Sequence, residues 1–316
     1  MIHLQQVQQA RASIAPMLSP TPLLLDHALS DRFGRRVLFK CELFQRTGSF
    51  KARGGLYWVR TASRAELAGG LGAVSAGNHA LGLAWAARKA GVPVTIVMPE
   101  NASRFKVTGS RELGAEVILH GDINDAWALM HQLVEERGLT LVHPYDNERI
   151  IAGQGTVGLE ILEQAPKASV IVCPVGGGGL ISGIGVVTAA MRPELALVGV
   201  EPSGAASMAH AWASGAPAPL AQVATCAKSL AAAVVGDYTY PLCLANTQEL
   251  ASVGEGAIRR AMTHLIYQTK LLAEPGAAVG VAALLENAVE LPPRGDIVVV
   301  ITGGNMSGEE LGEFLN

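Results

Sequence analysis

The sequence predicts an α/β fold built on mostly parallel sheets. From about residue 70 onward, short apolar runs alternate with segments of helical periodicity almost without interruption. The chain has 316 residues, of which 49% are hydrophobic, and a mean hydropathy of +0.30, so it has ample material for a large buried core. Alternation of this kind indicates parallel strands with helices on both faces of the sheet.

The elements are expected in the following order. Residues 1–20 are predicted to form a surface helix and a loop, and an extended stretch begins at Thr21-Pro22-Leu23 because a residue before proline avoids helical backbone. The expected strands are residues 37–42, 72–75, 92–98, 116–120, 139–143, 169–173, 196–200 and 296–301. The expected helices are residues 53–63, 79–90, 103–113, 124–137, 156–164, 180–191, 248–268 and 276–291.

This order of elements predicts two domains. Residues 70–146 are compact enough for a small open α/β domain, and residues 1–69 and 147–316 are expected to form a larger one. Ligands of such sheets bind beyond the carboxyl ends of the strands. Ser75, Gly176 and Thr302 all lie at such ends of predicted strands, so the fold can gather them at one cleft.

Composition limits the partners of the chain. The net charge is −3 and no Lys/Arg cluster is present, so we expect no nucleic-acid binding. Only 16% of residues are charged, which suggests that apolar surface is hidden, and a homodimer interface is the simplest place for it. The four cysteines are far apart and form no Cys-x-x-Cys pair, so neither a zinc site nor a disulfide framework is indicated.

The expected location is the cytoplasm, without membrane association. The N-terminal residues are polar and helix-like and lack the basic start and apolar core of a signal peptide. The stretch from Val170 to Met191 contains no charged residue and is long enough to cross a bilayer. Pro174 and four glycines interrupt it, so a strand, a tight loop and a buried helix are the better interpretation.

A lysine among small residues is the first candidate for chemistry. Lys51 ends the stretch Thr47-Gly48-Ser49-Phe50-Lys51, shortly after an apolar run. A lysine amine usually becomes a useful nucleophile by forming a Schiff base with an aldehyde cofactor. The alternative is an ordinary surface lysine whose stem covers apolar surface.

A run of four glycines is the second candidate. Gly176 to Gly179 lie between a predicted strand and a helix that opens at Leu180, where free backbone N–H groups can converge on a phosphate. A dinucleotide fingerprint does not fit, because its third glycine would fall on Ile181 or Ser182. A purely structural glycine turn remains an alternative.

Four stretches in this order resemble the fold-type-II pyridoxal-phosphate enzymes, whose fold is like that of the tryptophan synthase β-subunit. They are Ser49-Phe50-Lys51, Ser75-Ala76-Gly77-Asn78-His79, Gly176 to Leu180 and Thr302-Gly303-Gly304-Asn305. The residues of these motifs are most similar to those of the threonine and serine dehydratase branch, which includes serine racemase. The resemblance extends from Thr21 to Asn305 and implies two open α/β domains with the cofactor in the cleft between them.

The resemblance also implies roles for single residues. Lys51 would be the Schiff-base lysine of pyridoxal 5'-phosphate and the catalytic base. The other implied cofactor contacts are Phe50, Asn78, Gly176, Gly177, Gly178, Gly179, Leu180, Glu274 and Thr302. The implied substrate contacts are Ser75, Ala76, Gly77, Asn78 and His79. Thr302 would stand beside the pyridine nitrogen, where a hydroxyl makes the ring a weaker electron sink than a carboxylate would and so favours elimination over transamination.

The implied activity is a pyridoxal-phosphate-dependent dehydratase (ammonia-lyase), a carbon–oxygen lyase. Its substrate would be a β-hydroxy-α-amino acid such as threonine, serine, 3-hydroxyaspartate or phenylserine, converted to a 2-oxo acid and ammonia. A racemase, a diaminopropionate lyase, a β-replacing synthase and a catalytically silent ligand-binding protein on the same fold remain alternatives. Racemisation is expected to be minor, because the resembling racemases have a serine hydroxyl at the position of Ala76.

Two departures from the family pattern affect metal use and substrate choice. Relatives often bind a divalent cation at the positions of Glu201, Ala205 and Ser207, and the serine replaces a carboxylate, which makes metal dependence doubtful. Lys228-Ser229 replaces a usual Asp-Gly pair, so Lys228 either favours an acidic substrate or is simply exposed to solvent. The chain ends soon after Asn305, so we also expect no inhibition by isoleucine.

Overall fold

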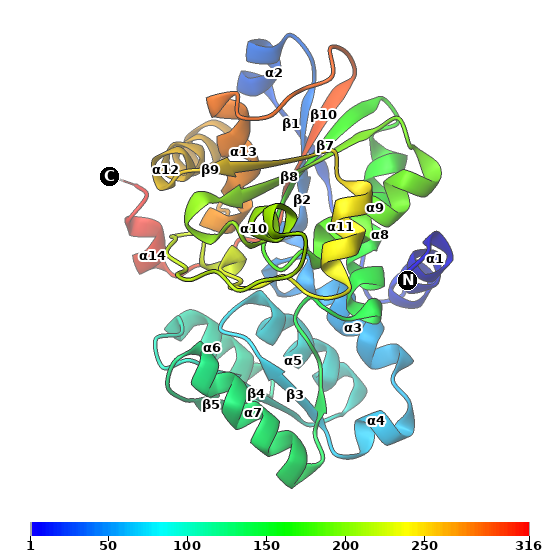
Figure 1. Ribbon diagram of the computed structural model, residues 1–316, viewed down its shortest axis with the longest axis vertical. Coiled ribbons are helices and arrows are strands. Elements are labelled where there is room, and N and C mark those ends of the chain that lie inside the picture. Colours follow the sequence, from blue (N-terminus) through cyan, green and yellow to red (C-terminus); the bar gives the residue numbers. More distant parts are fainter. Residues whose placement is uncertain (1, 316) are drawn as a thin grey trace.

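In the computed structural model, which describes residues 2–315, the strands form two sheets (Figure 1). The larger sheet has the order β1-β2-β10-β7-β8-β9, and the smaller has the order β5-β4-β3-β6. Neighbouring strands are parallel except for β1 and β2. The strands are β1 (Leu23–Asp26), β2 (Val37–Cys41), β3 (Leu71–Val74), β4 (Val94–Met98), β5 (Glu116–Leu119), β6 (Thr140–Leu141), β7 (Ala168–Pro174), β8 (Ala196–Pro202), β9 (Glu249–Val253) and β10 (Asp296–Ile301).

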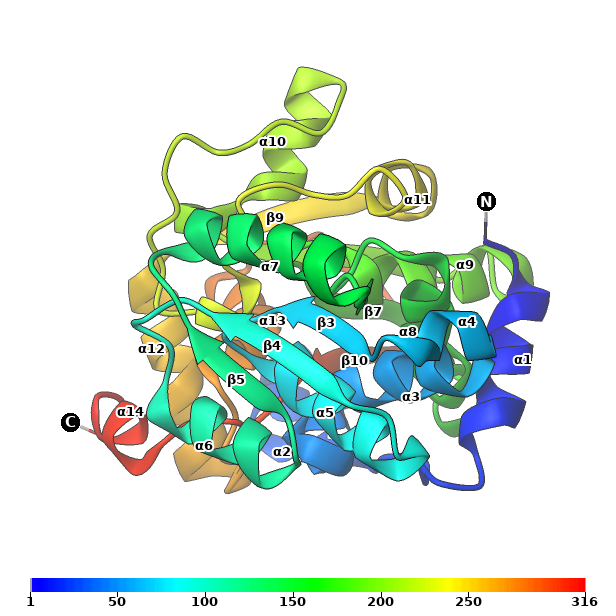
Figure 2. The same cartoon turned by 90° about the horizontal axis from the view of Figure 1, so that it is seen from below.

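Helices surround both sheets. They are α1 (Leu4–Ile14), α2 (His27–Phe33), α3 (Lys51–Thr61), α4 (Arg64–Ala68), α5 (Asn78–Ala90), α6 (Arg104–Glu112), α7 (Ile123–Arg137), α8 (Glu148–Gln164), α9 (Gly179–Met191), α10 (Ser207–Ser214), α11 (Thr239–Asn246), α12 (Glu255–His264), α13 (Pro275–Glu286) and α14 (Gly308–Gly312). Figure 2 shows α7 on one face of the smaller sheet and α5 and α6 on the other. No helix within residues 2–315 is long and apolar enough to cross a membrane.

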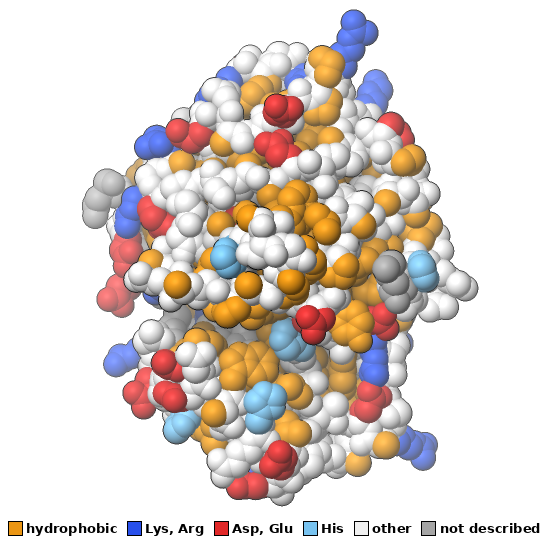
Figure 3. Space-filling model, viewed as in Figure 1, with side chains coloured by type: hydrophobic (Ala, Val, Ile, Leu, Met, Phe, Trp, Pro, Cys, Tyr) orange, Lys and Arg blue, Asp and Glu red, His pale blue; other side chains and the backbone are white. Residues whose placement is uncertain are grey.

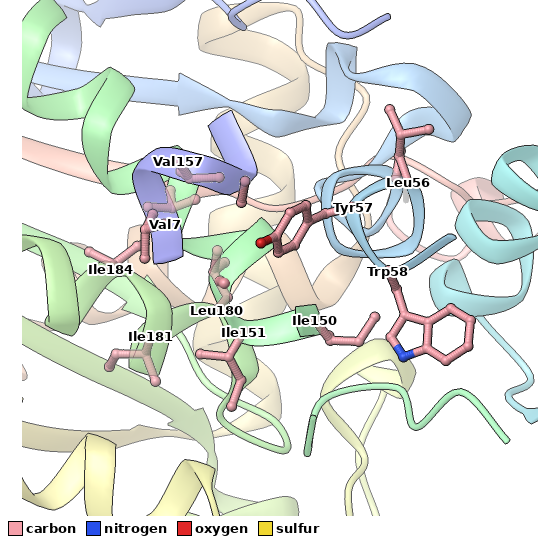
Figure 4. Close-up of a cluster of buried hydrophobic side chains, with 14 of the residues drawn as sticks. Val7, Leu56, Tyr57, Trp58, Ile150, Ile151, Val157, Leu180, Ile181 and Ile184 are labelled. Atoms are coloured by element: carbon pink, nitrogen blue, oxygen red, sulfur yellow. The ribbon is translucent and has the colours of Figure 1, made fainter. Parts of the chain in front are cut away.

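A layer of helices joins the two halves of the molecule. Helix α3 contacts α5 beside the smaller sheet and α8 beside the larger one, and α8 in turn packs on α9. Figure 4 shows apolar side chains of α1, α3, α8 and α9 meeting in this layer, including Val7, Trp58, Ile150 and Ile184. Because α3 begins at Lys51, the same packing that joins the halves also positions the candidate lysine.

Four buried charged side chains fix the start of α3 against the larger sheet. The Arg53 guanidinium donates to both Glu42 oxygens at 2.8 Å and to Glu160 at 2.6 Å, and Lys40 Nζ lies 2.5 Å from Glu160. These residues come from β2, α3, α8 and the turn after β2, and each is no more than 6% exposed. Charged side chains are tolerated in a protein interior when they are paired with opposite charges and hydrogen-bonded, as these four are.

Most expected elements are present, with two informative differences. The single helix predicted for residues 248–268 was wrong in its first part, because Glu249–Val253 forms edge strand β9 and pairs with β8. Helix α8 begins at Glu148, earlier than the predicted residue 156, because the Asn147 side chain accepts the N–H groups of Arg149 and Ile150 and caps the helix.

Candidate active site

The side chain of Lys51 is half-buried at the start of α3, the helix that joins the two halves of the molecule. Its Nζ donates to the carbonyl oxygen of Pro144 at 2.6 Å and lies 5.2 Å from the centre of the Phe50 ring. Burial lowers the pKa of Lys51 to about 8, although the attraction of Glu274 opposes the shift. A large fraction of this amine is therefore neutral, and able to act as a nucleophile, at mildly alkaline pH.

A left-handed turn directly before Lys51 is clamped to the end of β10. Thr47 and Gly48 have φ values of 61° and 72°. Gly48 accepts from the N–H of Gly304 at 3.0 Å, and the Asn305 side chain donates to the carbonyl of Thr47 at 2.6 Å. Phe50, the residue before the lysine, is bound there too, because its N–H donates at 3.2 Å to the carbonyl of Thr302, which directly follows β10.

A buried hydrogen-bond network surrounds Asn78 at the start of α5. Its Nδ2 donates to Glu274 at 2.5 Å, and its Oδ1 accepts from Asn305 at 2.8 Å. The second oxygen of Glu274 lies 3.5 Å from Lys106 Nζ. Asn78 and Lys106 belong to helices beside the smaller sheet, whereas Glu274 directly precedes α13 beside the larger one. The network thus connects the two halves at the candidate site.

The glycine loop lies where β7 ends and α9 begins. Gly178 has a φ of +90°, which favours glycine, and α9 starts at the next residue. The N–H groups in the first turn of a helix have no intrahelical acceptor, and the helix dipole favours an anion there. Because β7 and β10 are neighbours in the sheet, Gly176 and Thr302 follow adjacent parallel strand ends.

The Ser75-to-His79 loop ends β3 and opens α5. The Ser75 hydroxyl accepts from the N–H of Gly77 at 3.2 Å, and Gly77 has open space around its Cα. His79 Nε2 is 2.9 Å from the carbonyl oxygen of Val142, so this nitrogen carries the proton. Burial lowers the pKa of His79 to about 3, which keeps the ring neutral.

Sequence reasoning missed a segment that runs from the smaller sheet to α8, residues 143–146. Tyr145 packs against Gly177 and Gly179, and its hydroxyl donates to the carbonyl of Val234 at 2.8 Å. The Asp146 carboxylate accepts backbone N–H groups from residues 237–239. The segment directly follows a predicted strand, and that position is the signal by which it could have been found. Figure 3 shows the face on which the two halves meet, hollowed at their boundary and bordered there by hydrophobic side chains and histidines.

The two unusual residues of the 228–229 pair point in different directions. Lys228 is exposed at the surface. The hydroxyl oxygen of Ser229 is buried without a hydrogen-bond partner in the described part of the chain, and it lies against Gly276 in the first turn of α13. The inward residue of the pair is therefore the serine, whereas sequence reasoning had considered the lysine.

The remaining candidate, Glu201, serves as a helix cap. Its two carboxylate oxygens each accept a backbone N–H at 2.8 Å, from Met208 and Ala209 at the start of α10. Burial raises its pKa to about 7, although these hydrogen bonds oppose the shift. Ala205 is buried in the preceding turn. Within residues 2–315, no group of three or more His, Cys, Asp or Glu side chains is arranged to hold a metal ion.

The donor set fits a phosphate-bearing aldehyde. The site combines an amine with lowered pKa and a glycine loop whose free N–H groups suit an anion. Several buried polar atoms in and beside it have no hydrogen-bond partner within residues 2–315, namely Thr47 Oγ1, Ser49 Oγ, His79 Nδ1 and Ser229 Oγ. An unpaired buried polar atom costs about 1–3 kcal/mol, so such a cluster is typical of a site that receives a polar ligand.

Comparisons with known proteins agree with this fit. The chain is 39% identical to L-threonine ammonia-lyase of Thermotoga maritima over 317 aligned residues, covering 100% of this chain and 79% of that protein. It is 36% identical to phenylserine dehydratase of Ralstonia pickettii, covering 89% of this chain and 86% of that protein. The solved structure of maize serine racemase superposes with a TM-score of 0.94 at 33% identity, covering 99% of this chain and 96% of that one. The family described as pyridoxal-phosphate dependent enzyme matches residues 14–303, and the chain belongs to this family.

Proposed function

We propose that this protein is a pyridoxal-phosphate-dependent ammonia-lyase that converts a β-hydroxy-α-amino acid to a 2-oxo acid and ammonia. The observation that carries the proposal is the Lys51 amine with its lowered pKa, which donates to Pro144 and follows a residue, Phe50, that is hydrogen-bonded to Thr302 after β10. The ammonia-lyase and dehydratase relatives support the same activity.

In this proposal the chain's residues hold the cofactor at both ends. Lys51 binds its aldehyde carbon, and the N–H groups from Gly176 to Leu180 bind its phosphate. Phe50, Asn78, Glu274 and Thr302 surround the ring. When bound, pyridoxal phosphate supplies an electron sink for the pair of electrons left at the α-carbon.

Lys51 and the loop of residues 75–79 then act on the substrate. The substrate carboxylate is bound by the N–H groups and hydroxyl of the loop formed by Ser75, Ala76, Gly77, Asn78 and His79. The neutral Lys51 amine takes the α-proton as general base, since its lowered pKa makes a large fraction of it neutral at mildly alkaline pH. The buried neutral His79 positions this loop through Val142 and is not a proton carrier in the proposal.

A keto-acid assay tests the proposal. The purified, cofactor-loaded protein is incubated with threonine, serine, 3-hydroxyaspartate and phenylserine, and 2-oxo acid and ammonia are measured. We expect release from at least one of them, loss of release in Lys51→Ala, and retention in Lys89→Ala, which changes an exposed lysine. Absence of product from all four substrates, or product formation by Lys51→Ala, would contradict the proposal.

Racemisation is the second candidate function, because a serine racemase is structurally similar to this chain. Changing the α-configuration needs an acid–base group on the face opposite Lys51. The methyl group of Ala76 can neither accept nor donate a proton, so we place racemisation below elimination. Chiral chromatography of residual L-serine after partial turnover distinguishes the two.

We further propose that activity does not require a divalent cation. Glu201 uses both carboxylate oxygens to cap α10, and Ser207 stands where a second acid would help to hold a cation. Treatment with a chelator is therefore expected to leave the rate of keto-acid release unchanged. A chelator-sensitive rate restored by magnesium or calcium would refute this point.

Several broader properties also remain proposals. We propose a small domain of residues 70–146 and a large domain of residues 1–69 and 147–316. We also propose a cytoplasmic homodimer that binds a small amino acid and neither nucleic acid nor membrane. The supporting observations are the low charged fraction of 16%, exposed apolar side chains such as Phe44 and Leu272, and four free cysteines. Sedimentation of the cofactor-loaded protein tests the dimer.

A further inference from the structure

The hydroxyl of Ser229 is a polar atom that the fold leaves unsatisfied. Its Oγ is buried and has no hydrogen-bond partner among the described residues. It would lie 2.2 Å from a side-chain carbon built on Gly276, so Ser229 packs directly on the first turn of α13. The next residue, Leu230, lies against Gly176, since its Cα would be 3.0 Å from a carbon built there. Ser229 therefore lies between the glycine loop and the helix that directly follows Glu274.

Hydrogen bonds hold the turn around Ser229 in place. Glu255 accepts from the Thr225 hydroxyl at 2.7 Å and from the N–H of Cys226 at 2.8 Å. Leu230 N donates to the carbonyl of Ala227 at 2.8 Å. These contacts fix the backbone on both sides of Ser229, and its hydroxyl oxygen remains buried and away from water.

Two of the three groups of the substrate have a binding residue in the proposed function, and the substrate side chain has none. An α-amino acid presents an amine, a carboxylate and a side chain. In the proposed function the amine is directed to Lys51 and the carboxylate to residues 75–79. Residues 143–146 and 228–230 are two further segments that contact the glycine loop, through Tyr145 against Gly177 and Leu230 against Gly176. The Tyr145 hydroxyl already donates to the carbonyl of Val234, whereas the Ser229 hydroxyl has no partner among the described residues.

We propose that the Ser229 hydroxyl hydrogen-bonds to the β-hydroxyl of the substrate and thereby selects hydroxyamino acids. This inference rests on the proposed function. A site built to pair with a hydroxyl discriminates strongly against an analogue that lacks it, because its own polar group is then left unpaired. Ser229 is accordingly a specificity-determining residue, and the turn that carries it differs from the usual Asp-Gly of the resembling enzymes.

The test compares two substrates with the same carbon skeleton. L-Serine and β-chloro-L-alanine both yield pyruvate, but only serine carries the β-hydroxyl. In Ser229→Ala we expect the kcat/KM for serine relative to chloroalanine to fall about tenfold or more, the effect of losing one buried hydrogen bond. Ser207→Ala is the matched control, because its hydroxyl is also buried without a partner but lies at the start of α10. Its substrate ratio is expected to stay unchanged.

Two measurements without turnover complete the test. Pyridoxal phosphate titrated into the cofactor-free protein should bind Ser229→Ala as tightly as the unmodified chain, because the hydroxyl is assigned to the substrate. The melting temperature of the cofactor-free variant should rise by about 1–3 °C, since an unsatisfied buried hydroxyl has been removed.

Each contrary result has a defined meaning. An equal loss for both substrates, an unchanged ratio, weaker cofactor binding or a lower melting temperature would each overturn the assignment of Ser229. If the unmodified protein releases no 2-oxo acid from any hydroxyamino acid, the proposed function and this inference both fail. If it does release product while Ser229→Ala keeps the original ratio, only the Ser229 assignment fails.

Discussion

The ring of Tyr145 lies so close to Gly177 that a side-chain carbon on the glycine would be 2.3 to 2.4 Å from three ring atoms. The ring has little freedom to move away, because its hydroxyl is anchored to Val234 and the following Asp146 binds three backbone N–H groups. Gly177 is therefore required for the close approach of two segments as well as for a free loop backbone.

Gly177→Ala should weaken cofactor binding because the added methyl displaces either the ring or the loop. Overpacking of this kind costs about 1–3 kcal/mol, so we expect affinity to fall about tenfold or more. Absorbance titration of the cofactor-free protein with pyridoxal phosphate measures it. Gly256→Ala is the control, since a methyl there would approach only the Arg260 side chain, at 3.6 Å. Equal affinities in the two variants would argue against the Tyr145 contact.

Cofactor incorporation should become faster as the pH rises through about 8, the lowered pKa of Lys51. Only the neutral amine is a nucleophile, and burial disfavours the charged form, so the fraction able to react grows until the amine is deprotonated. Stopped-flow absorbance of the cofactor-free protein mixed with pyridoxal phosphate reports the rate at each pH. A rate that is flat from about pH 7 to 9, or that bends only near the ordinary lysine pKa of about 10.4, would contradict the shift.

Acid should destabilise the protein through His79 before carboxylates titrate. Burial lowers the pKa of His79 to about 3, so the folded state binds fewer protons than the unfolded state. The free energy of unfolding then falls as the pH drops below about 6.5, the pKa of histidine in the unfolded chain. Between about pH 7 and 5, His79 alone is expected to lower it by about 2 kcal/mol. Urea unfolding at both pH values measures it. The loss should be smaller in His79→Gln but unchanged in His210→Gln, which alters an exposed histidine.

The buried charge network should be far more sensitive to substitution than a surface ion pair. Glu160→Gln removes the charge that faces both Arg53 and Lys40, and breaking a buried pair costs about 3–5 kcal/mol. Glu163→Gln is the matched control three residues further along α8. Its partner Arg11 is more than one-third exposed, and such pairs contribute about 0–1 kcal/mol. Similar unfolding free energies for the two variants would show that the network contributes little.

Ala76→Ser should increase racemisation relative to elimination. In the proposed function the added hydroxyl is an acid–base group on the face opposite Lys51, and a positioned group of this kind is typically worth about 10²–10⁴-fold in rate. Chiral chromatography of residual L-serine gives the ratio, with the unmodified protein as reference. Rapid appearance of D-serine in the unmodified protein would mean that another group already reaches that face.

The elements and the family motifs were accessible from the sequence because they are local. A strand of the larger sheet is an apolar run buried on both faces, and helix starts and glycine turns are set by neighbouring residues, so β2, β7 and β10 and the loop before Leu180 could be located from the printed chain. Edge strand β9 could not, because Glu249–Val253 is extended only through its pairing with β8. Its pattern alone was compatible with the helix that follows.

Only the tertiary structure decided which residues that are distant in the sequence make contact. Asn78 and Glu274 are 196 positions apart and meet because two sheets are packed through α3, which no local pattern encodes. Lys40 and Arg53 look like surface charges in the sequence, yet they are buried with Glu160. Which member of the Lys228-Ser229 pair faces the protein likewise depends on how the turn packs on Gly276. The sequence thus determined the local elements and chemical groups, and long-range packing decided which groups meet, because burial and pairing depend on the whole fold.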